Sequence, residues 1–304
     1  MNAAPKTLPL ILGLLGVAVS PLLLLATRET PEFLIASYAL AFLPYFLVLF
    51  FLRRTPTTRA LFLGVLLAGV LLRILFLPFA PVLSDDIYRY VWDGRVAMSG
   101  INPFAFAPQA EELRHLRDAA IWPLINHPTV PTIYPPAAQL VFQLNALRGG
   151  GIILLRALFL GFEAIFLGIA WWLLRRTASP WSRKAVLGAF AIYVLNPLVA
   201  DEIAWSGHLD VLAWGPMALC LLGLERLVVA KRARVAGLLL GFSIAAKILG
   251  VVLVPFLLLR KRDDERIPWR TVLAHRALML GTTGILVASL FVPYLDVGGK
   301  QLFQ

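Results

Sequence analysis

Residues 8–26 read LPLILGLLGVAVSPLLLLA, an apolar run that contains no charged side chain. A helix needs about 20 such residues to cross the roughly 30 Å of hydrocarbon in a bilayer. Because a helix that is apolar all round has no face for water, lipid or other protein must surround it. The run therefore predicts a transmembrane helix.

Comparable runs recur along the chain and predict an all-α fold, a polytopic transmembrane helical bundle. The further spans that we expect are 33–52, 60–77, 152–174, 185–200 (interrupted by Asn196-Pro197), 209–230 and 272–291. Two segments do not fit this pattern: Ala137–Leu147 is too short to cross, and Val235–Leu259 contains Lys247. We expect the first to be a half-helix and the second to be two short helices that turn back near Lys247. Irregular backbone at membrane depth needs protein or a water-filled cavity around it, so both segments indicate an internal cavity.

The composition supports a membrane protein and argues against a nucleic-acid partner. Of the 304 residues, 60% are hydrophobic and 15% are charged, whereas soluble domains are about a quarter charged. The net charge of +11 comes from short basic clusters between apolar runs, which is the pattern of the positive-inside rule. These clusters lie at 53–59, 175–184, 231–234 and 260–270, and we expect them in the cytoplasm. The long loop 78–136 would then face the extracytoplasmic side of the cell membrane.

That loop opens with SDDIYRYVWDGR at residues 84–95. Its adjacent carboxylates, Asp85 and Asp86, directly follow a predicted span, at the edge of lipid where charge is costly. At helical spacing, Asp85, Arg89 and Asp93 lie on one face. One interpretation is an interfacial helix with ion pairs. The other is a carboxylate that acts as a general base or that binds a hydroxyl-rich substrate.

Charged residues elsewhere raise similar alternatives. Glu202, His208 and Asp210 lie between two predicted spans, either as a solvated turn or as part of a site. Lys247 interrupts an apolar run, and an ammonium at that depth requires an anionic partner. Arg73, near the outer end of its span, is expected to extend towards the lipid headgroups.

Taken in order, these motifs resemble those of the GT-C class of integral-membrane glycosyltransferases. The stretch Asp85-Asp86-x-Tyr88-Arg89-Tyr90-x-Trp92-Asp93-Gly94-Arg95, followed by Gly100-x-Asn102-Pro103, looks like the polyprenol-phosphate-mannose-dependent mannosyltransferases and their bacterial relatives. The likeness covers about Ala60 to Tyr294 and continues through Asn196-Pro197, Glu202, Ser206-Gly207-His208-x-Asp210 and the run from Gly241 to Lys247. It implies transfer of a sugar, with mannose expected, from a polyprenol-phosphate donor to a glycan or glycolipid acceptor outside the cytoplasm.

The expected reaction assigns roles to these residues. It needs a base for the acceptor hydroxyl and positive charge for the departing phosphate. Asp85 or Asp86 is the expected base, with Asp86 slightly preferred, while the other acid caps the helix or pairs with Arg89. Adjacent acids at a helix start point about 100° apart, so we do not expect both to play the same role. The residues expected to bind donor or acceptor are Tyr88, Arg89, Asp93, Arg95, His127, Tyr134, Glu202, His208, Asp210 and Lys247.

A transporter or lipid flippase is the competing class, because it would also have intramembrane charges and broken helices. The predicted spans show no internal repeat, however, and a long outer loop suits a reaction at the outer face better than alternating access. The acids could hold a divalent cation, but their spacing does not require one, so we expect no metal site and no cofactor. GT-C enzymes usually carry several more helices. Residues 1–304 are therefore expected to form a single domain that is a truncated version or a fragment.

Overall fold

The computed structural model describes residues 7–176, 183–224, 230–259 and 268–295. All regular secondary structure in these residues is helical, which confirms the predicted all-α fold. The chain divides into two compact units. The first comprises Met1–Ser84 and Trp171–Gly207, and the second comprises Asp85–Ala170 and His208–Gln304. Helix α6 (Ile152–Arg176) contributes residues to both.

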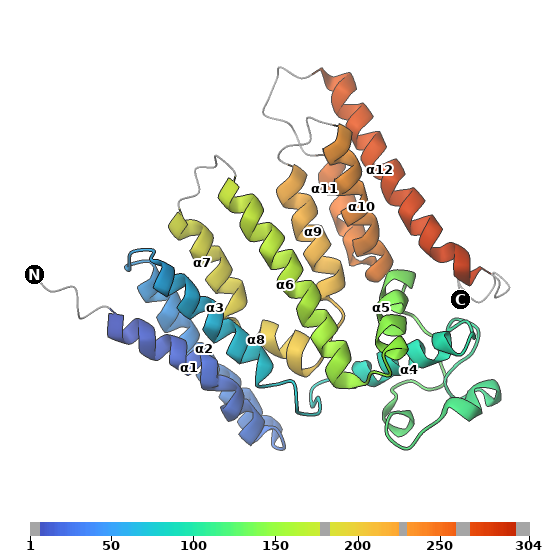
Figure 1. The fold of residues 1–304 in the computed structure, drawn as a ribbon, viewed down its shortest axis with the longest axis horizontal. Coiled ribbons are helices and arrows are strands. Elements are labelled where there is room, and N and C mark those ends of the chain that lie inside the picture. Colours follow the sequence, from blue (N-terminus) through green and yellow to red (C-terminus); the bar gives the residue numbers. More distant parts are fainter. Residues whose placement is uncertain (1–6, 177–182, 225–229, 260–267, 296–304) are drawn as a thin grey trace, which may run out of the picture. The chain divides into compact units, whose positions relative to one another are not determined.

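The first unit contains α1 (Thr7–Thr27), α2 (Pro31–Leu52), α3 (Arg59–Ile74), α7 (Arg183–Val194), the short α8 (Pro197–Ala200) and a π-helical turn, Asp201–Trp205. Helix α1 packs against α2 and α3 (Figure 1). Pro31 lies in the first turn of α2, where its missing N–H costs nothing. The Thr58 hydroxyl caps α3 by accepting the backbone N–H of Leu61.

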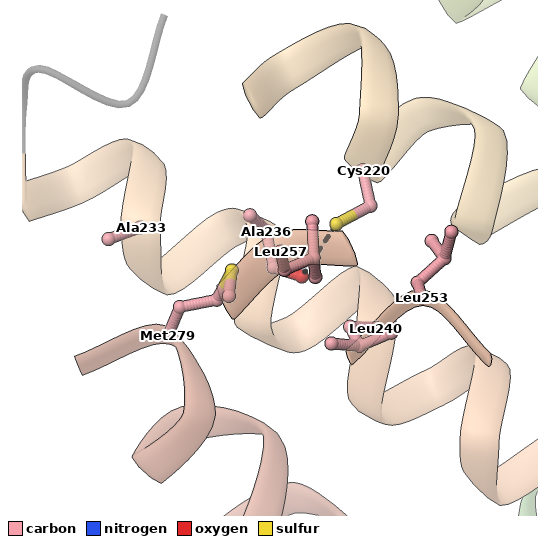
Figure 2. Close-up of a cluster of buried hydrophobic side chains, with 7 residues drawn as sticks. All are labelled: Cys220, Ala233, Ala236, Leu240, Leu253, Leu257 and Met279. Atoms are coloured by element: carbon pink, nitrogen blue, oxygen red, sulfur yellow. Dashed lines mark hydrogen bonds between the residues drawn. The ribbon is translucent and has the colours of Figure 1, made fainter. Parts of the chain in front are cut away.

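The second unit contains α4 (Asp86–Met98), two 3-10 turns (Glu111–Leu116 and Trp122–Leu124), α5 (Pro136–Leu147), α9 (Val211–Leu224), α10 (Ala230–Ala246), a 3-10 turn (Ile248–Val252), α11 (Leu253–Leu259), α12 (Trp269–Phe291) and a last 3-10 turn, Val292–Tyr294. Figure 2 shows the buried cluster that joins α9, α10, α11 and α12. In it, the Cys220 thiol of α9 points towards the Ala236 carbonyl of α10, at 3.6 Å. Helix α12 approaches α10 closely because Gly237 lies against the Met279 carbonyl, where a Cβ would not fit.

The expected spans are largely confirmed as helices. In the described residues, α1, α2, α6 and α12 are long and apolar enough to cross a membrane. Helix α7 and the segment from Pro197 to Trp205 form an apolar pair bent by 55°, which corresponds to a broken span or to a re-entrant loop. The bend lies at the predicted interruption, where Pro197 disfavours a helical conformation of Asn196 and the Asn196 side chain caps the next helix. Helix α3 is shorter than predicted: it ends at Ile74 rather than Leu77, and the last residues form turns that lead into Pro78.

The two irregular segments are also as predicted. Helix α5 has 12 residues, which is about 18 Å and hence a half-helix. Helix α10 ends at Ala246, and Lys247 has an extended backbone with φ −156° and ψ 133°. The chain then turns back, since Leu257 of α11 joins the same buried cluster as Ala236 of α10. The end of the predicted span 209–230 lies partly outside the described residues, and α9 ends at Leu224.

The expectation for Arg73 was wrong. Its side chain is buried instead of extending to headgroups, and it donates hydrogen bonds to the carbonyls of Val194 (2.7 Å) and Gly69 (3.1 Å). Helix α3 contacts α7 so closely at Gly69 that no Cβ fits against Val194. The carbonyl at the end of α7 needs a donor, and Arg73 provides it.

Candidate active site

The start of α4 brings two carboxylates onto one amide. The Asn126 side-chain nitrogen donates to Asp85 Oδ1 at 2.9 Å and to Asp86 Oδ1 at 2.6 Å. Asp85 is exposed and Asp86 is half-buried. The expected angle of about 100° between the two acids applies to residues within a helix. Asp85 precedes the helix, with φ −107° and ψ 1°.

The expected pairing of Arg89 with Asp85 or Asp86 is wrong, whereas the expected face shared by Arg89 and Asp93 is confirmed. Asp85 occupies the N-cap position of α4, but its side chain makes no capping hydrogen bond. Arg89 pairs with Asp93 one turn further on, with 2.8 Å between Nε and Oδ1. A pair four residues apart on a helix is favoured by its geometry.

The Arg89–Asp93 pair holds the loop that carries Asn126. Both side chains are buried, with 5% and 3% exposed. Arg89 also donates to the Val130 carbonyl at 2.8 Å and to the His127 carbonyl at 3.5 Å, while Asp93 accepts from the Thr132 hydroxyl. Because its guanidinium is occupied by these bonds, the geometry favours a positioning role for Arg89 over contact with a phosphate.

A buried tyrosine lies beside the acid pair. The ring of Tyr90 stacks on Phe142 of α5, with centroids 4.8 Å apart, and meets the edge of Tyr134 at 4.7 Å. Burial raises the pKa of Tyr90 well above its ordinary value. Tyr134, Asp86 and Asp210 raise the Tyr90 pKa further through their charges.

Lys247 has the anionic partner that its position required. Its ammonium lies 2.7 Å from Asp210 Oδ1. The two side chains are 48% and 39% exposed, so the pair is open to a ligand. Asp210 directly precedes α9, and its carbonyl accepts the N–H groups of Ala213 and Trp214. The second unit thus holds both an acid pair joined by Asn126 and a lysine–aspartate pair.

The other predicted residues are placed differently. Arg95 pairs with Asp118, a partner that the sequence analysis did not identify. His127 has an exposed side chain and a positive φ of 44°. Tyr88 and His208 are half-buried in the second unit, whereas Glu202 is exposed and belongs to the first unit.

Partial burial alone would raise the pKa of Asp118. Hydrogen bonds from the Ile121 backbone and from Arg95 outweigh that effect and lower the Asp118 pKa to about 2. Within the described ranges, no group of three or more His, Cys, Asp or Glu side chains is arranged to hold a metal ion.

Asn126 is the site residue that sequence reasoning missed. It stands in the motif Asn126-His127-Pro128, from which only the histidine was selected. Its amide reaches the acids across a separation of 40 residues, which no local pattern reveals.

Comparisons with known proteins identify the family of the chain. The chain is 29% identical over 235 residues to Alpha-(1->6)-mannopyranosyltransferase A of Mycobacterium tuberculosis (strain ATCC 25618 / H37Rv). The match covers 73% of this chain but only 42% of that relative's length. No solved structure matches the chain. The model of the MptA_B family, described as Alpha-(1->6)-mannopyranosyltransferase, N-terminal domain, matches residues 16–261, which is most of the chain and includes every predicted site residue. The chain belongs to this mannosyltransferase family, which confirms the resemblance first seen in its motifs.

Proposed function

We propose that this chain carries the catalytic centre of a multi-pass membrane mannosyltransferase that uses a polyprenol-phosphate mannose donor. The acceptor is a hydroxyl of a glycan or glycolipid on the extracytoplasmic face of the cell membrane. The observation that carries the proposal is that one compact unit contains both the acid pair joined by Asn126 and the Lys247–Asp210 pair. Family membership and the printed name of the relative support the choice of mannose.

The reaction is a direct displacement at the anomeric carbon. The acceptor oxygen forms a bond to that carbon while the bond from the carbon to the phosphate oxygen breaks. The acceptor proton passes to a carboxylate, and the electron pair of the broken bond leaves with the polyprenol phosphate. Such a step inverts the anomeric centre and requires no covalent intermediate. General base catalysis of this kind contributes about 10²–10⁴-fold.

Asp86 is the preferred base. It is half-buried beside Tyr90, whereas Asp85 is exposed. The hydrogen bonds from Asn126 hold the two carboxylates in place, and we assign the acceptor proton to Asp86. Asp85 would then orient the acceptor by accepting a hydroxyl hydrogen bond.

Lys247 would stabilise the departing phosphate. Its ammonium has three hydrogens, so a bond to Asp210 leaves two for phosphate oxygens. The 3-10 turn that follows has exposed apolar side chains, Ile248 and Val252 among them, at 69% and 58%. An ammonium next to an apolar surface suits a lipid phosphate, because the ammonium binds the charged phosphate and the apolar surface contacts the hydrocarbon tail.

The test is mannose transfer from labelled polyprenol-phosphate mannose in membranes that contain the chain. We expect Asp86→Asn to lower turnover by about 10²–10⁴-fold, and Asp85→Asn to raise the apparent KM for the acceptor. Glu112→Gln, an exposed acid of the same loop, is the matched control and should transfer normally. Near-normal transfer by both aspartate variants would refute the assignment. Movement of intact donor across the membrane without transfer would favour a flippase instead.

A further inference from the structure

A pocket in the first unit is lined by three arginines. It has a volume of 240 Å³, and Arg59, Arg175 and Arg183 come to it from the start of α3, the end of α6 and the start of α7. All three side chains are exposed, and none makes an ion pair or hydrogen bond with a residue in the described part of the chain. No acidic side chain lines the pocket. Three like charges in one hollow repel each other unless an anion joins them.

The surroundings of these arginines also suit an anion. The N-terminal ends of α3 and α7 open onto the pocket, and helix N-termini favour negative charge. The hydroxyls of Thr57 and Thr58 are further lining groups. Trp171 also lines the pocket. Its ring packs on Phe62 with centroids 4.7 Å apart, and the guanidinium carbon of Arg175 lies 5.7 Å from its centroid.

The position of the pocket identifies the source of the anion. Arg175 lies in the last turn of α6, which is long enough to cross a membrane, and Arg183 begins α7, the first helix of the bent apolar pair. The pocket therefore lies where spans meet the membrane surface, in the two basic clusters that the sequence places on the cytoplasmic side. A neighbouring groove of 820 Å³ shares Thr58 with it and continues along α1 and α3 between leucines such as Leu14 and Leu67. Basic pockets between spans at this face bind anionic headgroups, and an apolar groove accepts an acyl chain.

We infer that the three-arginine pocket binds the phosphate of an anionic membrane phospholipid, with an acyl chain in the adjoining groove. The site is independent of the proposed transfer reaction, because all its lining residues lie in the first unit. A bound anion would cancel the repulsion among the arginines and tie α3, α6 and α7 together at one end.

The test is native mass spectrometry of the full chain, released from bilayers that contain phosphatidylglycerol and phosphatidylcholine. The wild type should retain phosphatidylglycerol preferentially. The triple variant Arg59→Gln, Arg175→Gln, Arg183→Gln should bind it on the order of a hundredfold more weakly, at about fivefold per arginine. Arg53→Gln, Arg234→Gln, Arg270→Gln removes the same charge from exposed positions outside the pocket and should retain the lipid.

Three results would overturn the inference. Equal losses in both triple variants would mean that only net charge matters, and displacement of the lipid by millimolar inorganic phosphate would indicate a site for a soluble anion. A photoactivatable phosphatidylglycerol on the wild type provides a readout that does not depend on the variants' folding. It should crosslink near Trp171 and Val186, and labelling elsewhere alone would refute the site.

Discussion

Two acid–base pairs of nearly equal length should respond very differently to the same substitution. Arg89–Asp93 measures 2.8 Å and Lys247–Asp210 measures 2.7 Å. Distance alone would predict similar energies. The two pairs differ in burial: the side chains of Arg89 and Asp93 are 5% and 3% exposed, whereas those of Lys247 and Asp210 are 48% and 39% exposed.

We therefore compare Asp93→Asn with Asp210→Asn. Asp93→Asn leaves a buried guanidinium without its counter-charge, which costs about 3–5 kcal/mol. Asp210→Asn breaks a pair that water already screens, which costs less than about 1 kcal/mol. The Asp93 variant should also release the loop held by Arg89, so that its transfer activity falls with the folded fraction. The Asp210 variant should fold normally and bind the donor more weakly, because Lys247 loses its anchor.

The free energy of unfolding can be measured by titration with a denaturing detergent in mixed micelles, followed by tryptophan fluorescence. Glu112→Gln serves as the control for the loss of one exposed carboxylate. A cost for Asp210→Asn that equals the cost for Asp93→Asn would show that burial does not decide these energies. A cost below about 1 kcal/mol for Asp93→Asn would refute the role of the buried pair in holding the loop.

Three further predictions concern single residues. Asn126→Ala removes the donor shared by the two acids and should lower transfer about 10- to 150-fold, the value of one or more hydrogen bonds to charged groups; unchanged transfer would exclude Asn126 from the site. Lys247→Met should weaken binding of polyprenol phosphate by a similar factor with little loss of stability, and Lys247→Arg should retain part of the affinity; a Met variant with normal donor affinity would contradict the proposed role. The pKa of Asp118, about 2 when folded, lies below its ordinary value of 3.8, so its contribution to stability is complete above that value and disappears as the pH falls towards 2. The difference in unfolding temperature between the wild type and Asp118→Asn should shrink over this window, and a constant difference would be contrary evidence.

Much of the fold follows from apolar run length and from two local signals. The helices α1, α2, α6 and α12 appear where the runs predicted them. Asn196-Pro197 and Lys247 were recognised as breaks because a proline and an ammonium at membrane depth each conflict with a continuous apolar helix. The orientation in the membrane and the extracytoplasmic position of the loop 78–136 remain predictions.

The site was harder to predict because its geometry is non-local. The helical face that joins Arg89 to Asp93 was predicted, but the bond from Arg89 to the Val130 carbonyl and the pairing of Lys247 with Asp210 were not. Arg73 was expected at the headgroups because the sequence does not show how closely α3 and α7 approach. A charge pattern predicts that a partner exists, and only the packing of helices shows which residue it is.

The contrast between the two ion pairs suits the two roles that we propose for them. A catalytic acid must be held within a fraction of an ångström, and rigid support for it comes from groups that are fully buried and fully bonded. Arg89 and Asp93 meet that description, and they act on the acid pair through the loop that carries Asn126.

A group that receives a substrate must keep free hydrogen-bonding capacity and access to solvent. Lys247 keeps both, since Asp210 uses only one of its three hydrogens and half of its side chain is exposed. If that division is correct, substitutions at Arg89 will act mainly on stability and those at Lys247 mainly on donor affinity. If substitutions at Arg89 mainly lowered donor affinity and those at Lys247 mainly lowered stability, the roles proposed for the two residues would have to be exchanged.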